Sequence, residues 1–134
     1  MSDASRIIAA ILLIAVLTIE FGGLSLLAML TRRIPGYLDN PLRQNMFRAG
    51  HAHAGVLLIL ALVGILYVDQ SDLSPGTRTL VRTGLALAPI LMPAGFFFSV
   101  LRPDADRPNR LIVLVYLGAL SLAAAAVTLG VSLL

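Results

Sequence analysis

The sequence contains no cysteine, no tryptophan and no lysine, and it is poor in charged residues of either sign. Only 13% of its 134 residues are charged, against about 25% in soluble domains. Without cysteine the chain has no disulfides, no CxxC redox site, no thiolate metal ligands and no cysteine nucleophile. It also lacks the G-x-S-x-G and H-E-x-x-H motifs and a phosphate-binding loop. The sequence therefore gives no positive reason to expect an enzyme.

Apolar residues are abundant instead, at 58% of the chain, and the mean hydropathy is +0.92. A helix of roughly 20 apolar residues crosses a bilayer core of about 30 Å. Four stretches are long enough, at about 7–30, 47–68, 80–101 and 111–134. The first is too long for a signal peptide and contains a glutamate. We therefore predict one all-α domain, 1–134, an integral membrane four-helix bundle with up-down-up-down topology and short loops.

Local signals mark the ends of the predicted helices. Ser5 or Asp3 is expected to cap the first helix, and a Pro-Gly pair follows its end. Asn40 followed by Pro41 is typical of an N-cap and a proline at the first helical position. The second helix is therefore expected to begin at Pro41, before the chain enters the membrane.

All ten basic residues are arginine, and the net charge is +3. They are scattered among apolar runs rather than clustered on one face, so no nucleic-acid partner is expected. Three lie near the N-terminus or the second loop, namely Arg6, Arg78 and Arg82. Seven flank the first and third loops, namely Arg32, Arg33, Arg43, Arg48, Arg102, Arg107 and Arg110. The positive-inside rule then predicts a bacterial inner-membrane protein with both termini outside the cytoplasm.

Glu20 is the only acidic residue within the predicted spans. It lies about 20 Å along the first helix from Ile7, at 1.5 Å per residue. A carboxylate at that depth is costly unless it is protonated or paired. One interpretation is a proton carrier or a metal-binding carboxylate. The alternative is a protonated glutamate that bonds to a neighbouring helix and fixes its packing.

His51 and His53 are the only histidines, and they stand in the segment RAGHAHAG. Helical residues two apart point about 200° away from each other, so the two rings are not expected to clamp one metal ion. They would instead face two different neighbours. The surrounding glycines and alanines would admit a bulky ligand or a closely packed helix. The alternative is that one histidine faces the lipid headgroups and the other is hydrogen-bonded in the protein core.

Alternating helices would bring Glu20, His53, Met92 and Tyr116 to nearly the same depth. We therefore take Glu20, His51 and His53 as candidate metal ligands, and His51, His53, Met92 and Tyr116 as candidate cofactor-binding residues. Imidazole suits iron, copper and zinc, and carboxylate or thioether ligands can complete the set.

The third span contains Pro89 and Pro93, which cannot donate helical hydrogen bonds to the carbonyls of Leu85 and Pro89. These oxygens could line a small cavity. The alternative is a kink that shapes helix packing, as membrane helices tolerate.

The RAGHAHAG segment resembles small four-helix bacterial membrane proteins that carry an H-x-H at the start of a helix. It is more distantly similar to the H-x-H helix of haem–copper oxidase subunit I, whose histidines serve haems on opposite faces. The resemblance implies that His51 and His53 face haem or a metal. The further histidines and the helix count of that subunit are missing, so oxidase chemistry is not implied.

Three functions compete. The first is a redox or metal module that binds haem or a transition metal, where paired-histidine ligation would need an oligomer. The second is a small proton-coupled transporter, because a lone Glu20 in the first of four helices resembles the dimeric small multidrug resistance exporters. The third is an accessory subunit that packs in a larger membrane complex through small-residue faces on the second and fourth helices.

Overall fold

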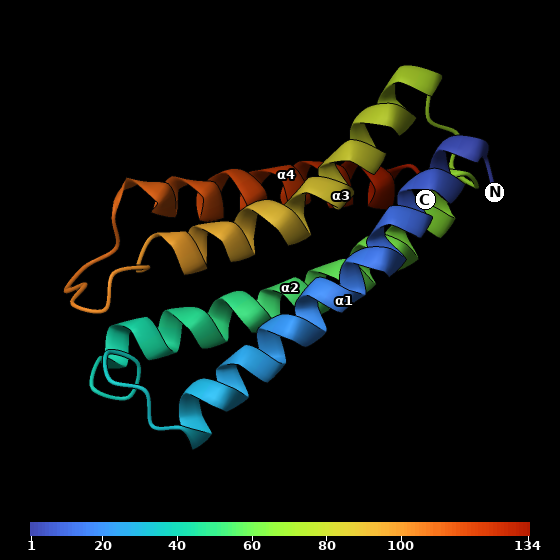
Figure 1. The fold of residues 1–134 in the computed structure, drawn as a ribbon. Helices are drawn as coiled ribbons and strands as arrows, with labels where there is room; N and C mark the ends of the chain where they lie inside the picture. Colours follow the sequence, from blue (N-terminus) through green and yellow to red (C-terminus); the bar gives the residue numbers. More distant parts are fainter.

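The computed structural model describes all residues 1–134 and contains four α-helices and no strand. Helix α1 spans Asp3–Thr31, α2 spans Pro41–Val68 and α3 spans Pro75–Phe98. A 3₁₀ turn, Arg110–Ile112, leads into α4, Val113–Val131. The helices alternate in direction, so both termini lie at one end (Figure 1). The all-helical prediction is confirmed, and each helix is long and apolar enough to cross a membrane.

The helix ends follow local capping chemistry. Helix α1 begins after Ser2, whose hydroxyl accepts a hydrogen bond from the backbone N–H of Ser5. The prediction that Ser5 or Asp3 caps this helix is therefore wrong, because an earlier serine can already satisfy the first free N–H groups. The prediction for the second helix is confirmed, since Asn40 caps it and Pro41 is its first residue.

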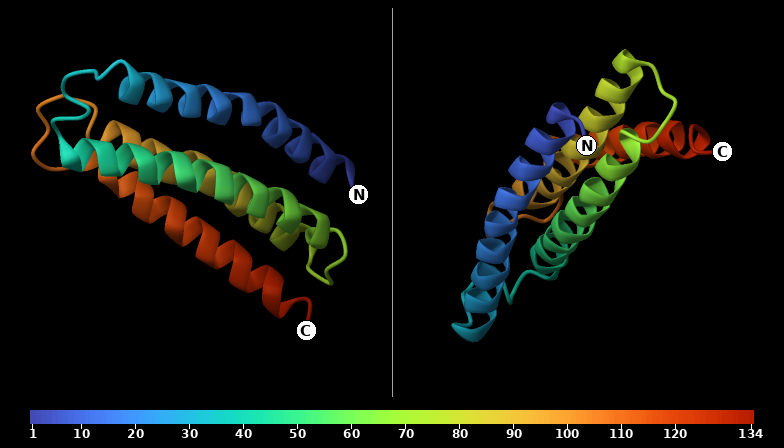
Figure 2. Two further views of the ribbon diagram at one scale, coloured as in Figure 1. Left: turned by 90° about the horizontal axis from the view of Figure 1, so that it is seen from below. Right: turned by 90° about the vertical axis from the view of Figure 1, so that its right-hand side faces the viewer.

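The four helices form an open bundle rather than a closed one (Figure 2). Helix α3 packs against both α2 and α4, whereas α1 packs on α2, touches α3 over a short stretch and makes no contact with α4. In the most apolar stretches of α2 and α3, 39% of residues are buried, against 6% in α1 and 11% in α4. The two flanking helices therefore leave wide apolar faces for lipid or for another protein.

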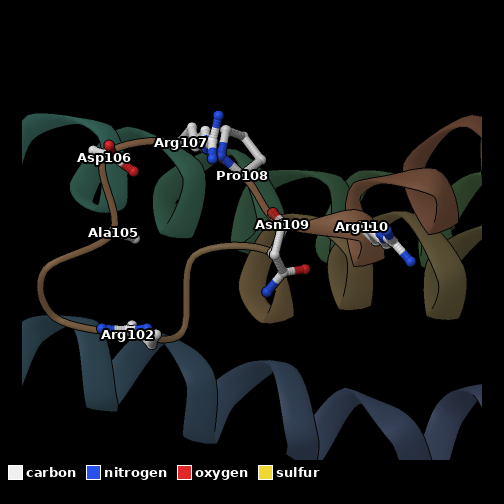
Figure 3. Close-up of a pocket in the computed structure, with 8 residues that line it drawn as sticks. Arg102, Ala105, Asp106, Arg107, Pro108, Asn109 and Arg110 are labelled. Carbon is white, nitrogen blue, oxygen red and sulfur yellow. The ribbon is translucent and has the colours of Figure 1, made fainter.

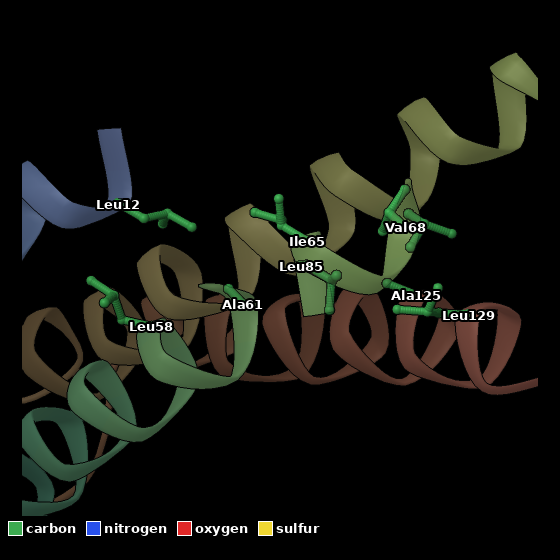
Figure 4. Close-up of a cluster of buried hydrophobic side chains, with 9 residues drawn as sticks. Leu12, Leu58, Ala61, Ile65, Val68, Leu85, Ala125 and Leu129 are labelled. Carbon is green, nitrogen blue, oxygen red and sulfur yellow. The ribbon is translucent and has the colours of Figure 1, made fainter. Parts of the chain in front are cut away.

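The largest buried cluster joins side chains of all four helices in the half of the bundle nearest the termini (Figure 4). Helix α2 supplies its centre, and Gly64 allows the close approach of α3, because a Cβ there would lie 2.8 Å from Leu85. The nine members are Leu12, Leu58, Ala61, Ile65, Val68, Val81, Leu85, Ala125 and Leu129.

Helix α3 changes direction near its middle (Figure 1), where it contains Pro89 and Pro93. Each proline lacks the N–H of a helical hydrogen bond, and its ring crowds the preceding turn, so kinks are expected at such positions. Both prolines line a cavity between α3, α2 and α1.

Candidate intramembrane site

The two histidines of α2 lie on different faces of the helix, as predicted. The ring of His51 reaches α1, where a Cβ at Gly22 or Gly23 would lie 3.5 or 3.2 Å from its nearest ring atom. The ring of His53 packs on Phe96 of α3, with 5.0 Å between the ring centroids. The glycines of α1 therefore make room for the imidazole of His51 itself.

His53 is held by its own helix. Its Nδ1 donates a hydrogen bond to the carbonyl of Ala49 at 2.7 Å. Because a carbonyl can only accept, Nδ1 carries the proton, and in the neutral ring Nε2 is the acceptor. The bond and the contact with Phe96 fix the orientation of this half-buried ring.

His51 lies in a cavity of about 280 Å³ between α1, α2 and α3. The wall is mostly aliphatic and carries no charged residue; His51 and Thr18 supply its polar side chains. The Thr18 hydroxyl already donates to the carbonyl of Ala15 at 2.6 Å. His51 makes no hydrogen bond, and its ring nitrogens are not among the sealed, unpartnered polar atoms, which are Tyr37 Oη and Arg78 Nε. The imidazole therefore lines the cavity with ring nitrogens that are neither hydrogen-bonded nor sealed.

The other predicted site residues lie elsewhere. Glu20 is exposed on α1 and does not line this cavity, although the preceding Ile19 does. One residue turns a helix by about 100°, so a shared depth does not give a shared face. Met92 is buried against Gly118 of α4, and Tyr116 is 68% exposed. Glu20 and the two histidines therefore do not line one cavity in this structure.

The structure brings no three His, Cys, Asp or Glu side chains close enough to hold one metal ion. Of the candidate ligands Glu20, His51 and His53, each faces a different surrounding: the exterior of α1, the cavity, and Phe96. Of these three candidate ligands, only His51 lines the cavity.

Sequence reasoning missed a polar cluster at the end of the molecule that holds the termini. Asp69, which directly follows α2, accepts hydrogen bonds from Arg82 Nη2 at 2.6 Å and from the hydroxyls of Ser2 and Ser5, each at 2.9 Å. It also accepts the backbone N–H of Ser2 at 2.6 Å. Arg82, only 7% exposed, comes from α3. Three helices therefore meet at one carboxylate.

Burial by itself raises the pKa of Asp69, but the hydrogen bonds from the Ser2 backbone, Arg82, and the Ser2 and Ser5 hydroxyls outweigh it and lower the pKa well below its usual range. The available signal was an arginine inside an apolar helix, which calls for a buried partner. Arg82 was counted with the arginines near the second loop, although the predicted span 80–101 already contains it.

A second, larger cavity of about 610 Å³ lies in the loop between α3 and α4 (Figure 3). Its wall is polar and includes Arg102, Arg107 and Arg110, all exposed. Arg102 is paired with Asp104 at 2.8 Å, and this hydrogen bond lowers the pKa of Asp104. The arginines face open surroundings at the opposite end from the termini, so this hollow is separate from the histidine site.

The chain matches no protein-family model, and no curated protein or solved structure is significantly similar to it.

Proposed function

We propose that the chain is an integral protein of a bacterial inner membrane, crossing it four times with both termini outside the cytoplasm. The length and apolarity of its helices support the crossing. More arginines lie near the first and third loops than near the N-terminus and the second loop, and this excess supports the orientation.

The cysteine-free sequence gives a direct topology test. Single cysteines replace Asp72 in the second loop and Asp106 in the third loop. A membrane-impermeant maleimide, added to cells with a permeabilised outer membrane, is expected to label Asp72→Cys directly and Asp106→Cys only after lysis. The reverse pattern would contradict the orientation, and equal labelling of both in unlysed cells would contradict a four-span topology.

We propose that the protein functions as an intramembrane binding module in which the imidazole of His51 holds the ligand. One observation carries this proposal: an imidazole without a hydrogen bond opens into a cavity between three apolar helices. Concave, mostly apolar sites with few polar groups are the usual form of small-molecule sites. A neutral imidazole can donate to a ligand, accept from it, or ligate a metal.

We include haem and transition metals among the possible ligands only where two or more chains bind them together. The cavity, at about 280 Å³, lies below the roughly 300–1,000 Å³ that hold drug-sized ligands, so a haem does not fit inside one chain in this arrangement. Paired-histidine ligation would place the group between two copies. A single chain brings no three His, Cys, Asp or Glu side chains together.

The test compares protein purified in mild detergent with its His51→Gln and His53→Gln variants. Absorption spectra, elemental analysis and mass spectrometry of an organic extract report any bound ligand. We expect a stoichiometric ligand that is lost in His51→Gln and retained in His53→Gln, because only His51 opens into the cavity. A ligand retained by both variants, or none in the wild type, would contradict the proposal.

The position of Glu20 supports a second proposal, which involves contact with another protein chain. It is exposed on α1, in no hydrogen bond or ion pair, between the exposed apolar residues Leu17, Phe21 and Leu24. A charged side chain facing lipid is costly. We therefore propose that this face of α1 is covered by protein, either a second copy of the chain or a larger membrane complex that it serves as a subunit.

The same residue could exchange a proton for a cationic substrate, as in a proton-coupled transporter. The test adds tetraphenylphosphonium to purified protein in weakly buffered detergent. Proton release that disappears in Glu20→Gln would support exchange. Release that persists in Glu20→Gln, or none in the wild type, would leave Glu20 as an interface residue.

A further inference from the structure

The cavity beside His51 has features that restrict the chemistry of its ligand. From these features we infer that it binds the neutral, oxygen-bearing ring of a lipid-soluble molecule, the chemistry of quinones and quinols. This inference rests on the proposed His51 site and names the class of its ligand.

The absence of charged residues from the cavity wall favours a neutral ligand. No arginine and no acidic residue lines the cavity, and the nearest acid along α1, Glu20, is exposed on its exterior. An anionic head, such as a carboxylate or a phosphate, would be desolvated without a fixed counter-charge. A cationic head would meet the same penalty. A head with carbonyl or hydroxyl oxygens needs hydrogen bonds only.

The polar groups of the wall supply both kinds of hydrogen bond. The imidazole of His51 offers one N–H donor and one acceptor nitrogen when neutral. Pro89 and Pro93 both line the cavity, and Pro93 has no N–H to donate to the carbonyl of Pro89. A carbonyl oxygen could accept from His51, and a hydroxyl could donate to His51 or to the Pro89 carbonyl, so the wall suits both redox forms of such a head.

The size and position of the cavity favour a ring with an apolar tail. A volume of about 280 Å³ accommodates a small ring but not a long chain. Helices α1 and α3, which form two of its walls, touch each other only over a short stretch. A tail can therefore leave between them into the apolar surroundings that the exposed faces of α1 imply. Phe97, in the wall, offers a ring for stacking.

The two histidines of the chain allow a site-resolved experiment. Protein labelled with ¹⁵N only in its histidine rings gives two sets of imidazole signals, which the His53→Gln variant assigns. A short-chain ubiquinone is titrated into the protein in mild detergent. We expect a saturable shift of the His51 signals with the His53 signals unchanged. An equal, non-saturating shift of both rings would show simple partition into the micelle and would overturn the inference.

A pair of variants tests whether the shift comes from the cavity. Ala15→Phe adds a ring to the α1 wall of the cavity and leaves His51 in the sequence, and Ala10→Phe adds the same ring at an exposed position of that helix. We expect at least tenfold weaker quinone binding in Ala15→Phe and unchanged binding in Ala10→Phe. Equal affinity in both variants would overturn the inference.

Parallel titrations with oleate, haemin and Zn²⁺ separate this inference from the proposed function. If oleate binds the site as strongly as the quinone, the inference that the ligand has a neutral head group is overturned. A His51 shift with haemin or Zn²⁺, and none with the quinone, would overturn the inference while the proposed His51 site stands. A His51 ring that responds to none of the probes would contradict both.

Discussion

Arg82 and Asp69 form a nearly buried ion pair, with 2.6 Å between Nη2 and Oδ1, at the end of the bundle that holds the N-terminus. The hydroxyls of Ser2 and Ser5, at the start of α1, donate hydrogen bonds to the same carboxylate. Helix α1 otherwise packs through apolar contacts on a small part of its surface. The polar cluster therefore ties the start of α1 to α3 and to the end of α2.

Asp69→Asn is expected to destabilise the protein by about 3 kcal/mol, because it leaves the buried guanidinium of Arg82 without its charge partner. The measurement is the thermal midpoint of helix loss by circular dichroism in detergent. Asp72→Asn, at an exposed position three residues on, is the matched control and should leave the midpoint unchanged. Equal midpoints for both variants would contradict a structural role for the pair.

The same carboxylate predicts a pH dependence. Because the pKa of Asp69 is lowered in the folded state, its contribution is fully present above the pKa of the unfolded chain, about 3.9, and is lost only as the pH falls through the folded value. The stability gap between wild type and Asp69→Asn should therefore stay constant from pH 8 to about pH 5 and narrow below about pH 4. A gap that narrows between pH 8 and 6 would contradict this assignment.

Arg43 joins the two loops at the opposite end. Its guanidinium donates to the carbonyls of Gly36 at 2.8 Å, Val100 at 3.2 Å and Leu101 at 3.3 Å. Arg43→Ala should lower stability by about 2 kcal/mol, since these acceptors lose a charged donor. Arg43→Lys should rescue it only in part, because an ammonium lacks the planar fork. Arg48→Ala, exposed and unbonded, is the control; full rescue by lysine would contradict the three-carbonyl geometry.

The contact between α3 and α4 depends on Gly118. A Cβ at this position would lie 2.5 Å from Met92 Cγ and 2.9 Å from its backbone nitrogen. Gly118→Ala should therefore destabilise the protein by about 1–3 kcal/mol despite the better helix propensity of alanine. Gly55→Ala, where nothing lies within 4 Å of the added Cβ, should be neutral or slightly stabilising. A stabilised Gly118→Ala would show that α4 is not held this closely.

The His53 ring should show one neutral tautomer. Its Nδ1 donates to Ala49 at 2.7 Å, so the ¹⁵N spectrum of the labelled protein should place the proton on Nδ1 at high pH. His51, which has no such bond, should not share this preference. A His53 ring protonated on Nε2 would contradict the hydrogen bond, and His53→Gln serves to assign the signals.

Much of the fold could be predicted from the sequence because helix formation depends on local chemistry. Apolar runs interrupted by proline, glycine and charge gave four helices, and the Asn40–Pro41 pair gave the start of α2. The opposite faces of His51 and His53 followed from the helical period. The N-cap of α1 was mistaken because several polar residues near a terminus can serve equally well, and a single sequence does not rank them.

The amino-acid order alone determined which segments are helical and apolar, because hydrogen bonding and burial along one helix involve residues close in sequence. Tertiary structure decided what each polar side chain meets. The rotation of α1 about its axis turned Glu20 outward and its glycines toward His51. The packing of α3 against α2 brought Arg82 to Asp69. Packing between helices fixes rotation and register, and those depend on contacts among residues far apart in the chain.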